Sequence, residues 1–120
     1  MNHVNDDNEL AKLGNLFLDS NKFEDAIRCY NDALVSIFIV EKMMNQGYKS
    51  EFFFAFQKKN ELNETCYKKR ATSYWNLKKF DEAILDLVTF LEIEPTDIAV
   101  QADLCELLSD AGRHTEANTG

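Results

Sequence analysis

The chain has 120 residues, of which 45% are hydrophobic and 28% charged, with four Gly and one Pro. This size fits one small domain, and the composition argues against disorder. The net charge of −8 argues against nucleic acid as a partner, because binding to phosphates needs an excess of Lys and Arg. There is no apolar run long enough to span a bilayer, so no membrane-spanning segment is expected and a membrane is not an expected partner. Residues 1–9 are polar and acidic, so no signal peptide is expected.

The three cysteines, Cys29, Cys66 and Cys105, are widely spaced and odd in number. Because no secretory signal is expected, they are predicted to be free thiols in a reducing compartment, which points to a cytoplasmic protein. Each is interpreted as a small buried apolar residue. The cysteines form no Cys-x-x-Cys pair and have no His partner, so no metal or other cofactor is expected.

The first predicted helix covers about residues 6–19, where apolar residues recur at helical spacing. Residues 20–22 form the predicted turn. Asn21, with Glu24 three residues later, has the spacing of a capping box for the next helix. A second helix follows. Its predicted inward face consists of Phe23, Ala26, Ile27, Tyr30, Ala33, Leu34 and Ile37, and it continues through Val40 and Met44 to a break at Asn45-Gln46-Gly47.

A third helix is predicted from about Ser50 to Leu77. It begins with the aromatic run 52–56, for which a strand is rejected because no other segment could pair with it. The fourth helix is predicted over 80–93. Its predicted inward residues are Ala83, Ile84, Leu87, Phe90 and Leu91. The fifth is predicted over about 97–111, with Thr96 as its N-cap and Gly112 as its end.

A short motif recurs along the chain. Phe80-Asp81-Glu82-Ala83-Ile84 repeats Phe23-Glu24-Asp25-Ala26-Ile27, and His114-Thr115-Glu116-Ala117 resembles both. The second and third copies are 34 residues apart, and the first two are 57 apart, which is 34 plus 23. A period of 34 residues is typical of stacked helix–turn–helix units.

On this register the chain resembles the tetratricopeptide repeat (TPR). Bulky residues such as Leu10, Leu13, Phe17 and Tyr30 fall at the bulky positions of that motif. Gly14, Ala26, Ala33, Ala71 and Ala83 fall at its small positions, where helices approach closely. Arg70 departs from the motif because it occupies a bulky position.

The resemblance implies an all-α right-handed superhelix of about five helices. The expected division is one domain, 1–120, with a first repeat at about 7–40, an insert at 41–63, a second repeat at 64–97 and an incomplete third at 98–117. The insert is expected to lengthen the second and third helices into a projecting hairpin, where Ile37, Val40 and Met44 could pack against Phe52 or Phe53, Phe56 and Leu62. The Phe-rich run is either mainly core or an exposed docking patch.

Residues 67–77 look like the middle repeat of co-chaperone TPR domains, which bind the Glu-Glu-Val-Asp tails of chaperones through a carboxylate clamp. The clamp positions correspond here to Ala11, Asn15, Lys69, Ala99 and Asp103. Only Asn15 is retained, and Lys69 is a substitute cation. Ala99 removes a positive charge and Asp103 reverses one, so the clamp is degraded.

The resemblance implies that the first helix of each repeat lines a concave groove. The residues expected to bind a peptide there are Lys12, Asn15, Lys68, Lys69, Thr72, Trp75 and Asn76, with Ala11 and Leu18 also facing inward. The lysines could receive an acidic or C-terminal peptide, and Trp75 an apolar contact. The alternative is a solvated charged face.

The expected function is a non-catalytic protein-interaction module, adaptor or co-chaperone-like, with a protein or peptide partner that could be a chaperone. The alternative is a self-associating fragment of a longer TPR protein. That alternative rests on the Phe-rich hairpin and on an expected exposed apolar strip on the fifth helix. This helix has two apolar sides, one with Val100, Leu104 and Leu107 and the other with Ala102, Cys105 and Leu108; one side is expected to pack on the fourth helix, and the other is where a sixth helix would pack. An enzyme is not expected, because no catalytic set, metal spacing or phosphate loop is visible.

Overall fold

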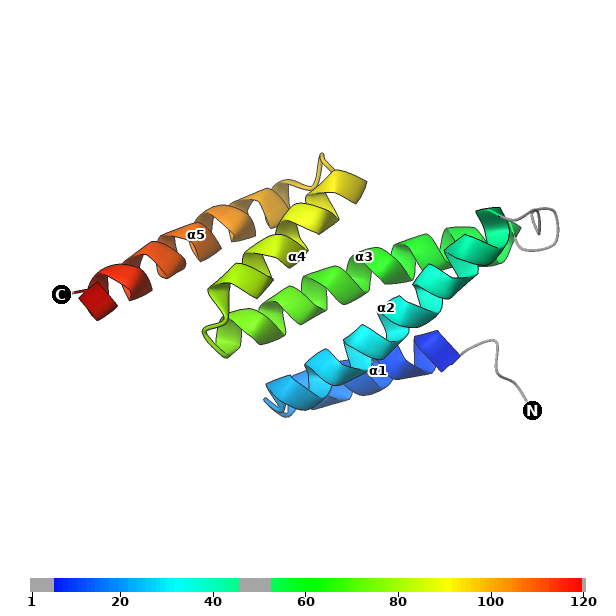
Figure 1. Ribbon diagram of the computed structural model, residues 1–120, viewed down its shortest axis with the longest axis horizontal. Coiled ribbons are helices and arrows are strands. Elements are labelled where there is room, and N and C mark those ends of the chain that lie inside the picture. Colours follow the sequence, from blue (N-terminus) through cyan, green and yellow to red (C-terminus); the bar gives the residue numbers. More distant parts are fainter. Residues whose placement is uncertain (1–5, 46–52, 120) are drawn as a thin grey trace.

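The computed structural model describes the backbone of residues 6–45 and 53–119, and side chains within 9–39, at 42 and within 62–114. The described residues form five helices and no strand. These are α1 (Asp6–Asp19), α2 (Phe23–Asn45), α3 (Phe53–Asn76), α4 (Phe80–Ile93) and α5 (Ile98–Thr119). Consecutive helices lie side by side, so α1 and α2 form one helical pair, α3 and α4 a second, and α5 packs on α4 (Figure 1). The predicted all-α fold is confirmed.

The two turns inside the helical pairs have the same backbone geometry. Asn21 and Lys78 both have a positive φ, 61° and 64°. At the end of α1, the amide of Lys22 donates to the carbonyl of Phe17 (2.8 Å); at the end of α3, the amide of Lys79 donates to that of Tyr74 (2.9 Å). This arrangement closes the C-terminus of a helix. The predicted capping box is therefore wrong, because Asn21 ends α1 instead of starting α2.

Small residues allow the helices of each pair to approach closely. Ala26, Ala71 and Ala83 are all buried. Gly14 is the tightest point: a Cβ built there would lie 2.8 Å from Cε1 of Tyr30, inside any normal contact distance. The ring of Tyr30 therefore occupies the space that a side chain at position 14 would need. The small positions of the repeat motif thus correspond to close helix contacts in the structure.

The hairpin extension is confirmed at the level of the backbone. Helices α2 and α3 have 23 and 24 residues, whereas α1 and α4 have 14 each. The difference of 9–10 residues corresponds to about 14 Å of extra helix. Ile37 is buried and Leu62 packs against the core of the first pair. The expected contacts of Val40, Met44, Phe52, Phe53 and Phe56, like the break at 45–47, lie outside the described residues.

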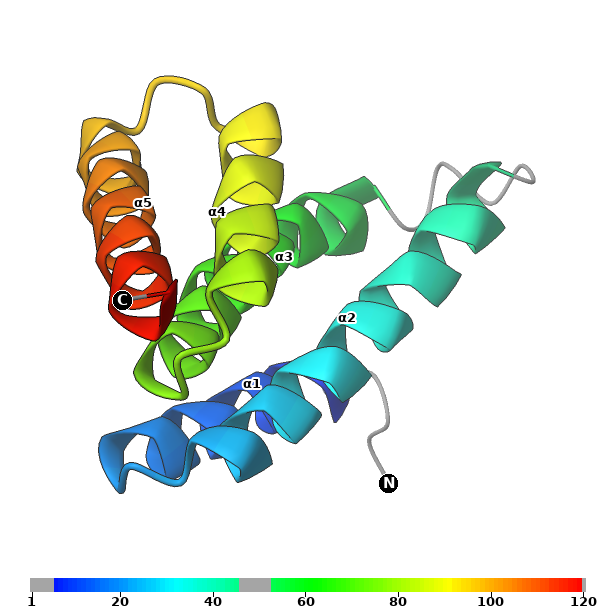
Figure 2. The same cartoon turned by 60° about the vertical axis from the view of Figure 1, so that its left-hand side comes forward.

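Two separate apolar clusters make up the core, and α3 contributes to both. The first is formed by α1, α2 and α3, and its buried members are Ala11, Ala26, Tyr30, Ala33 and Cys66. The second is formed by α3, α4 and α5, and its buried members are Ala71, Ala83, Leu87, Phe90, Val100 and Leu107. The predicted inward residues of the fourth helix all belong to the second cluster or pack against it, and those of the second helix from Ala26 to Ile37 are buried or half-buried, whereas Phe23 is half-buried and in neither cluster. Helix α3 therefore joins the two halves of the molecule (Figure 2).

Helix α5 is longer than expected. It runs from Ile98 to Thr119 and passes through Gly112, so the predicted end at Gly112 is wrong. A Gly inside a helix costs about 1 kcal/mol relative to Ala, which is not enough to stop it. The N-cap is also corrected: the amide of Val100 donates to Oδ1 of Asp97 (3.1 Å), so Asp97 caps the helix and Thr96 does not.

Several predicted core residues are exposed, and some predicted surface residues are buried. Leu13 is 43% exposed although it occupies a bulky position of the repeat. Ala11 is only 3% exposed and lies in the first cluster instead of facing a groove, and Leu18 packs against the same cluster. Cys29 and Cys66 are buried as expected, but Cys105 is exposed, and all three are free thiols. Among the described helices, none combines the length and apolar character needed to cross a bilayer.

Candidate peptide-binding surface

Four of the predicted site residues lie together on one side of α3. These are Lys68, Lys69, Thr72 and Asn76. Each follows the previous one by one to four positions, and helical geometry places all four within about 100° of one another around the axis. Lys68, Thr72 and Asn76 are exposed, and Lys69 is half-buried. The hydroxyl of Thr72 donates to the carbonyl of Lys68 (3.2 Å), and the amide of Asn76 donates to that of Thr72 (2.8 Å). We call these four residues the α3 face.

A shallow pocket of about 420 Å³ opens beside the two lysines. It is lined by Glu64, Thr65, Lys68 and Lys69 of α3 and by Phe90 of α4. Phe90 is a buried member of the second apolar cluster and is only 5% exposed, so it forms the floor of the pocket. Among the described residues, neither lysine ammonium takes part in an ion pair. The pocket therefore brings two lysines and the acidic Glu64 together above a buried aromatic residue.

The two predicted site residues of α1 make contacts within the protein. Nζ of Lys12 lies 3.9 Å from Oε1 of Glu9, and both side chains are well exposed. Oδ1 of Asn15 accepts a hydrogen bond of 2.5 Å from the hydroxyl of Tyr30. Burial raises the pKa of Tyr30, so this hydroxyl keeps its proton and stays a donor. Asn15 thus fixes α1 against α2 through its side-chain oxygen.

Trp75 points toward α5. Its indole Nε1 donates to Oδ2 of Asp110 (2.9 Å), and its ring packs against the second apolar cluster. Arg113 also donates to Asp110, one turn further along α5. Both contacts favour the charged carboxylate and lower the pKa of Asp110, with the Trp75 hydrogen bond as the larger cause. Trp75 therefore connects α3 to α5 in the free protein.

When the protein is titrated with acid, the fluorescence of Trp75, the single Trp of the chain, should change with a midpoint at a pH below about 3.9, the ordinary pKa of Asp. Because the folded-state pKa of Asp110 is lowered, its stabilising contact is complete above the unfolded value and is lost as the pH falls through the folded value. Far-UV circular dichroism recorded in parallel separates this event from unfolding. Asp110→Asn should abolish the transition; a midpoint at or above the ordinary value would contradict the assignment.

The clamp positions that fall on α5 carry no positive charge. Ala99 is exposed and Asp103 is half-exposed. Asp103 together with the exposed Glu106 makes this part of α5 acidic, whereas the α3 face is basic. A ligand with several carboxylates would thus be attracted by α3 and repelled by α5. The structure does not place a set of cations here that could hold two neighbouring carboxylates.

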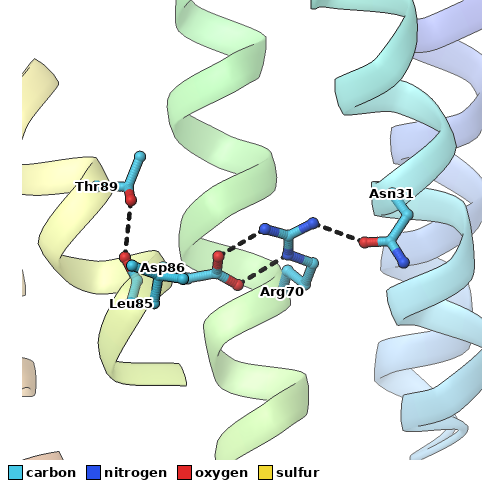
Figure 3. Close-up of polar contacts among 5 residues, drawn as sticks. All are labelled: Asn31, Arg70, Leu85, Asp86 and Thr89. Carbon is cyan, nitrogen blue, oxygen red and sulfur yellow. Dashed lines mark hydrogen bonds and ion pairs between the residues drawn. The ribbon is translucent and has the colours of Figure 1, made fainter. Parts of the chain in front are cut away.

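A polar network that joins three helices was missed from the sequence. Nε and Nη2 of Arg70 donate to the two carboxylate oxygens of Asp86 at 2.8 and 2.6 Å, and Nη1 donates to Oδ1 of Asn31 at 2.6 Å (Figure 3). The side chains of Arg70 and Asp86 are only 19% and 3% exposed. One guanidinium thereby connects α2, α3 and α4. The signal in the sequence was Arg70, a cation at a bulky position of the repeat, together with Asp86, an acid at an inward position of the next helix.

Aromatic rings complete the environment of Arg70. Its Cζ lies 5.5 Å from the ring centre of Tyr67 and 5.8 Å from that of Tyr74, within the range of cation–π attraction. Burial raises the pKa of the Asp86 carboxyl, while the hydrogen bonds and charge of Arg70 act in the opposite direction. The charged form of Asp86 therefore depends on Arg70.

The comparison with protein families identifies the central part of the chain. Residues 64–97 match the sequence model of the tetratricopeptide repeat family. Over these residues the chain is similar to a tetratricopeptide repeat. The matched TPR covers the second half of α3, all of α4 and the turn that leads into α5. It includes Lys68, Lys69, Phe90 and the Arg70–Asp86 pair.

Two further comparisons add little to this TPR assignment. No curated protein sequence is significantly similar to the chain. Among solved structures, one similar chain is described as the first TPR of Spaghetti (RPAP3) bound to the HSP90 peptide SRMEEVD. The two chains are 20% identical, the alignment covers 89% of this chain and 94% of that one, and the TM-score is 0.40.

Proposed function

We propose that this protein is a non-catalytic interaction module that binds an acidic peptide segment of a partner on the α3 face. The observation that carries the proposal is the pocket in which Lys68 and Lys69 stand beside Phe90. Two lysines in one pocket can form charge-assisted hydrogen bonds to a carboxylate of the ligand. The pocket is small and open, which fits one or two side chains of an extended peptide.

The charge of the whole chain makes this local arrangement informative. At a net charge of −8, long-range electrostatics repel an acidic ligand, so binding must come from contacts at the pocket itself. The rest of the α3 face, Thr72 and Asn76, can supply uncharged hydrogen bonds along the peptide backbone. Lys12 and Asn15 on α1 would form the opposite side of the surface, as the resemblance to co-chaperone domains implies. Trp75 would form an apolar border of the surface.

Lys69→Glu is expected to weaken binding of a fluorescein-labelled acidic peptide at least about tenfold, because it replaces a charge-assisted contact by repulsion. Fluorescence anisotropy measures the dissociation constant, and SRMEEVD with a free C-terminus is a suitable first probe, compared with a scrambled peptide of equal charge. Lys22→Glu, in the α1–α2 turn, makes the same charge change at an exposed site and is the matched control. Equal affinities for the two variants would eliminate the α3 face as the binding site.

One observation favours the alternative, self-association. Ile98 and Leu108 on α5 are 77% and 50% exposed, and the exposed Ala102 and Cys105 lie between them on the same side of the helix. The predicted exposed strip is therefore present on α5. Light scattering on the samples used for the binding experiment distinguishes the two functions, because the proposed module binds its peptide as a monomer.

A further inference from the structure

Arg70 lies where the two halves of the molecule meet. The first apolar cluster belongs to α1, α2 and the Cys66 side of α3, and the second belongs to α4, α5 and the Ala71 side of α3. The guanidinium of Arg70 sits on the same helix between these contributions, and its hydrogen bonds reach Asn31 in the first helical pair and Asp86 in the second (Figure 3). It is thus a polar link between two apolar units.

We propose that the Asn31–Arg70–Asp86 network fixes the angle between the α1–α2 pair and the α3–α4 pair, and so holds the α3 face in place relative to α1. Arg70 is a positioning residue in this proposal. The claim about the angle stands independently of the proposed function, and only its consequence for affinity rests on that function.

The chemistry of the network suits this role better than apolar contacts do. Apolar burial is non-directional and tolerates small rotations of one helix on another. The guanidinium is planar and presents its N–H groups in a rigid fork, so three bonds of 2.6–2.8 Å restrict its position. The bidentate pair with Asp86 holds Arg70 against α4. Nη1 is then left to donate a directed hydrogen bond to Asn31 on α2. A change of the angle between the two helical pairs would break the hydrogen bond from Arg70 to Asn31.

Arg70 does not belong to the binding surface itself. It is two positions from both Lys68 and Thr72, which places it about 160–200° from them around the helix axis. It therefore faces the interior while the α3 face points away from it. An effect of this network on peptide binding must act through the placement of α3.

The test uses Asn31→Ala, which removes the hydrogen bond between the two helical pairs and leaves the ion pair of Arg70 with Asp86 intact. Thr89→Ala is the matched control, because it removes a side-chain hydrogen bond of 2.8 Å that stays within α4. Asn31→Asp is the rescue variant, since it keeps the acceptor oxygen. Spin labels at Arg28→Cys on α2 and Glu82→Cys on α4, both exposed, report the distance between the pairs in a Cys105→Ser background.

We expect Asn31→Ala to broaden the distance distribution at least about twofold relative to Thr89→Ala, and Asn31→Asp to restore it. Affinity for the labelled SRMEEVD peptide should fall about threefold or more in Asn31→Ala only, which is within the range seen for coupled residues outside a site. An Asn31→Ala distribution as narrow as that of Thr89→Ala overturns the inference. Because the distance measurement needs no ligand, it decides the matter even if the peptide fails to bind the unmodified protein.

Discussion

Arg70→Ala is expected to lower the free energy of unfolding by about 3–5 kcal/mol, the usual cost of removing one partner of a buried ion pair. Asp86 is 3% exposed and would lose both of its hydrogen bonds from Arg70. Burial already raises its pKa, so without Arg70 the carboxylate must take up a proton or admit water. Urea denaturation followed by circular dichroism at neutral pH measures the loss, provided that the transition is two-state.

The double variant Arg70→Met with Asp86→Leu separates the cost of an unpaired charge from the value of the pair. Apolar replacement of a buried pair is often neutral or stabilising, so we expect it to regain most of the stability that Arg70→Ala loses. The same double variant also leaves Asn31 without its donor. A loss below about 1 kcal/mol in Arg70→Ala would contradict the burial of this pair.

Leu107→Ala is expected to lower the free energy of unfolding by about 2–5 kcal/mol, through lost burial and the cavity left behind. Leu107 is completely buried in the second apolar cluster, next to Val100 on the inward side of α5. The same urea denaturation measures the effect. The result tests whether α5 is an integral part of the fold.

The neighbouring residue supplies the control. Leu108 is half-exposed on the outer side of α5, so Leu108→Ala should change the stability by less than about 1 kcal/mol. Equal losses for the two variants would mean that both sides of α5 are covered, which would contradict the exposed strip. A small loss for both would mean that α5 packs only loosely on α4.

The helices themselves were predictable from local patterns. The bounds of α1, α2 and α4 agree with the predicted ranges, because apolar residues at helical spacing mark all three and the recurring Phe-x-x-Ala-Ile motif marks the starts of α2 and α4. The extended pair α2 and α3 followed from the spacing of 57 between two copies of this motif, which leaves 23 residues beyond one repeat. The errors at the ends of helices have local causes. Asn21 can end one helix or start the next, and Thr96 and Asp97 are both good N-cap residues for α5, so the sequence alone did not show which role or which residue would be used.

The candidate site was only partly predictable. The proximity of Lys68, Lys69, Thr72 and Asn76 follows from helical spacing alone, since all four are on one helix. The contribution of Phe90 to their pocket required the packing of α4 on α3. The inward position of Ala11 and the contact of Trp75 with Asp110 also depend on how one helix lies on another. Periodicity says which residues share a face, but it does not say what that face meets.

The sequence by itself determined that this protein is a stack of helices with one recognisable tetratricopeptide repeat, because that information is carried by periodicity within each helix and by the spacing between repeats. Only the tertiary structure decided the role of Arg70, which looked like a departure from the motif. Its partners Asn31 and Asp86 lie 39 and 16 residues away along the chain. Hydrogen bonds need directed contact within about 3 Å, and folding alone brings groups so distant in sequence to that separation.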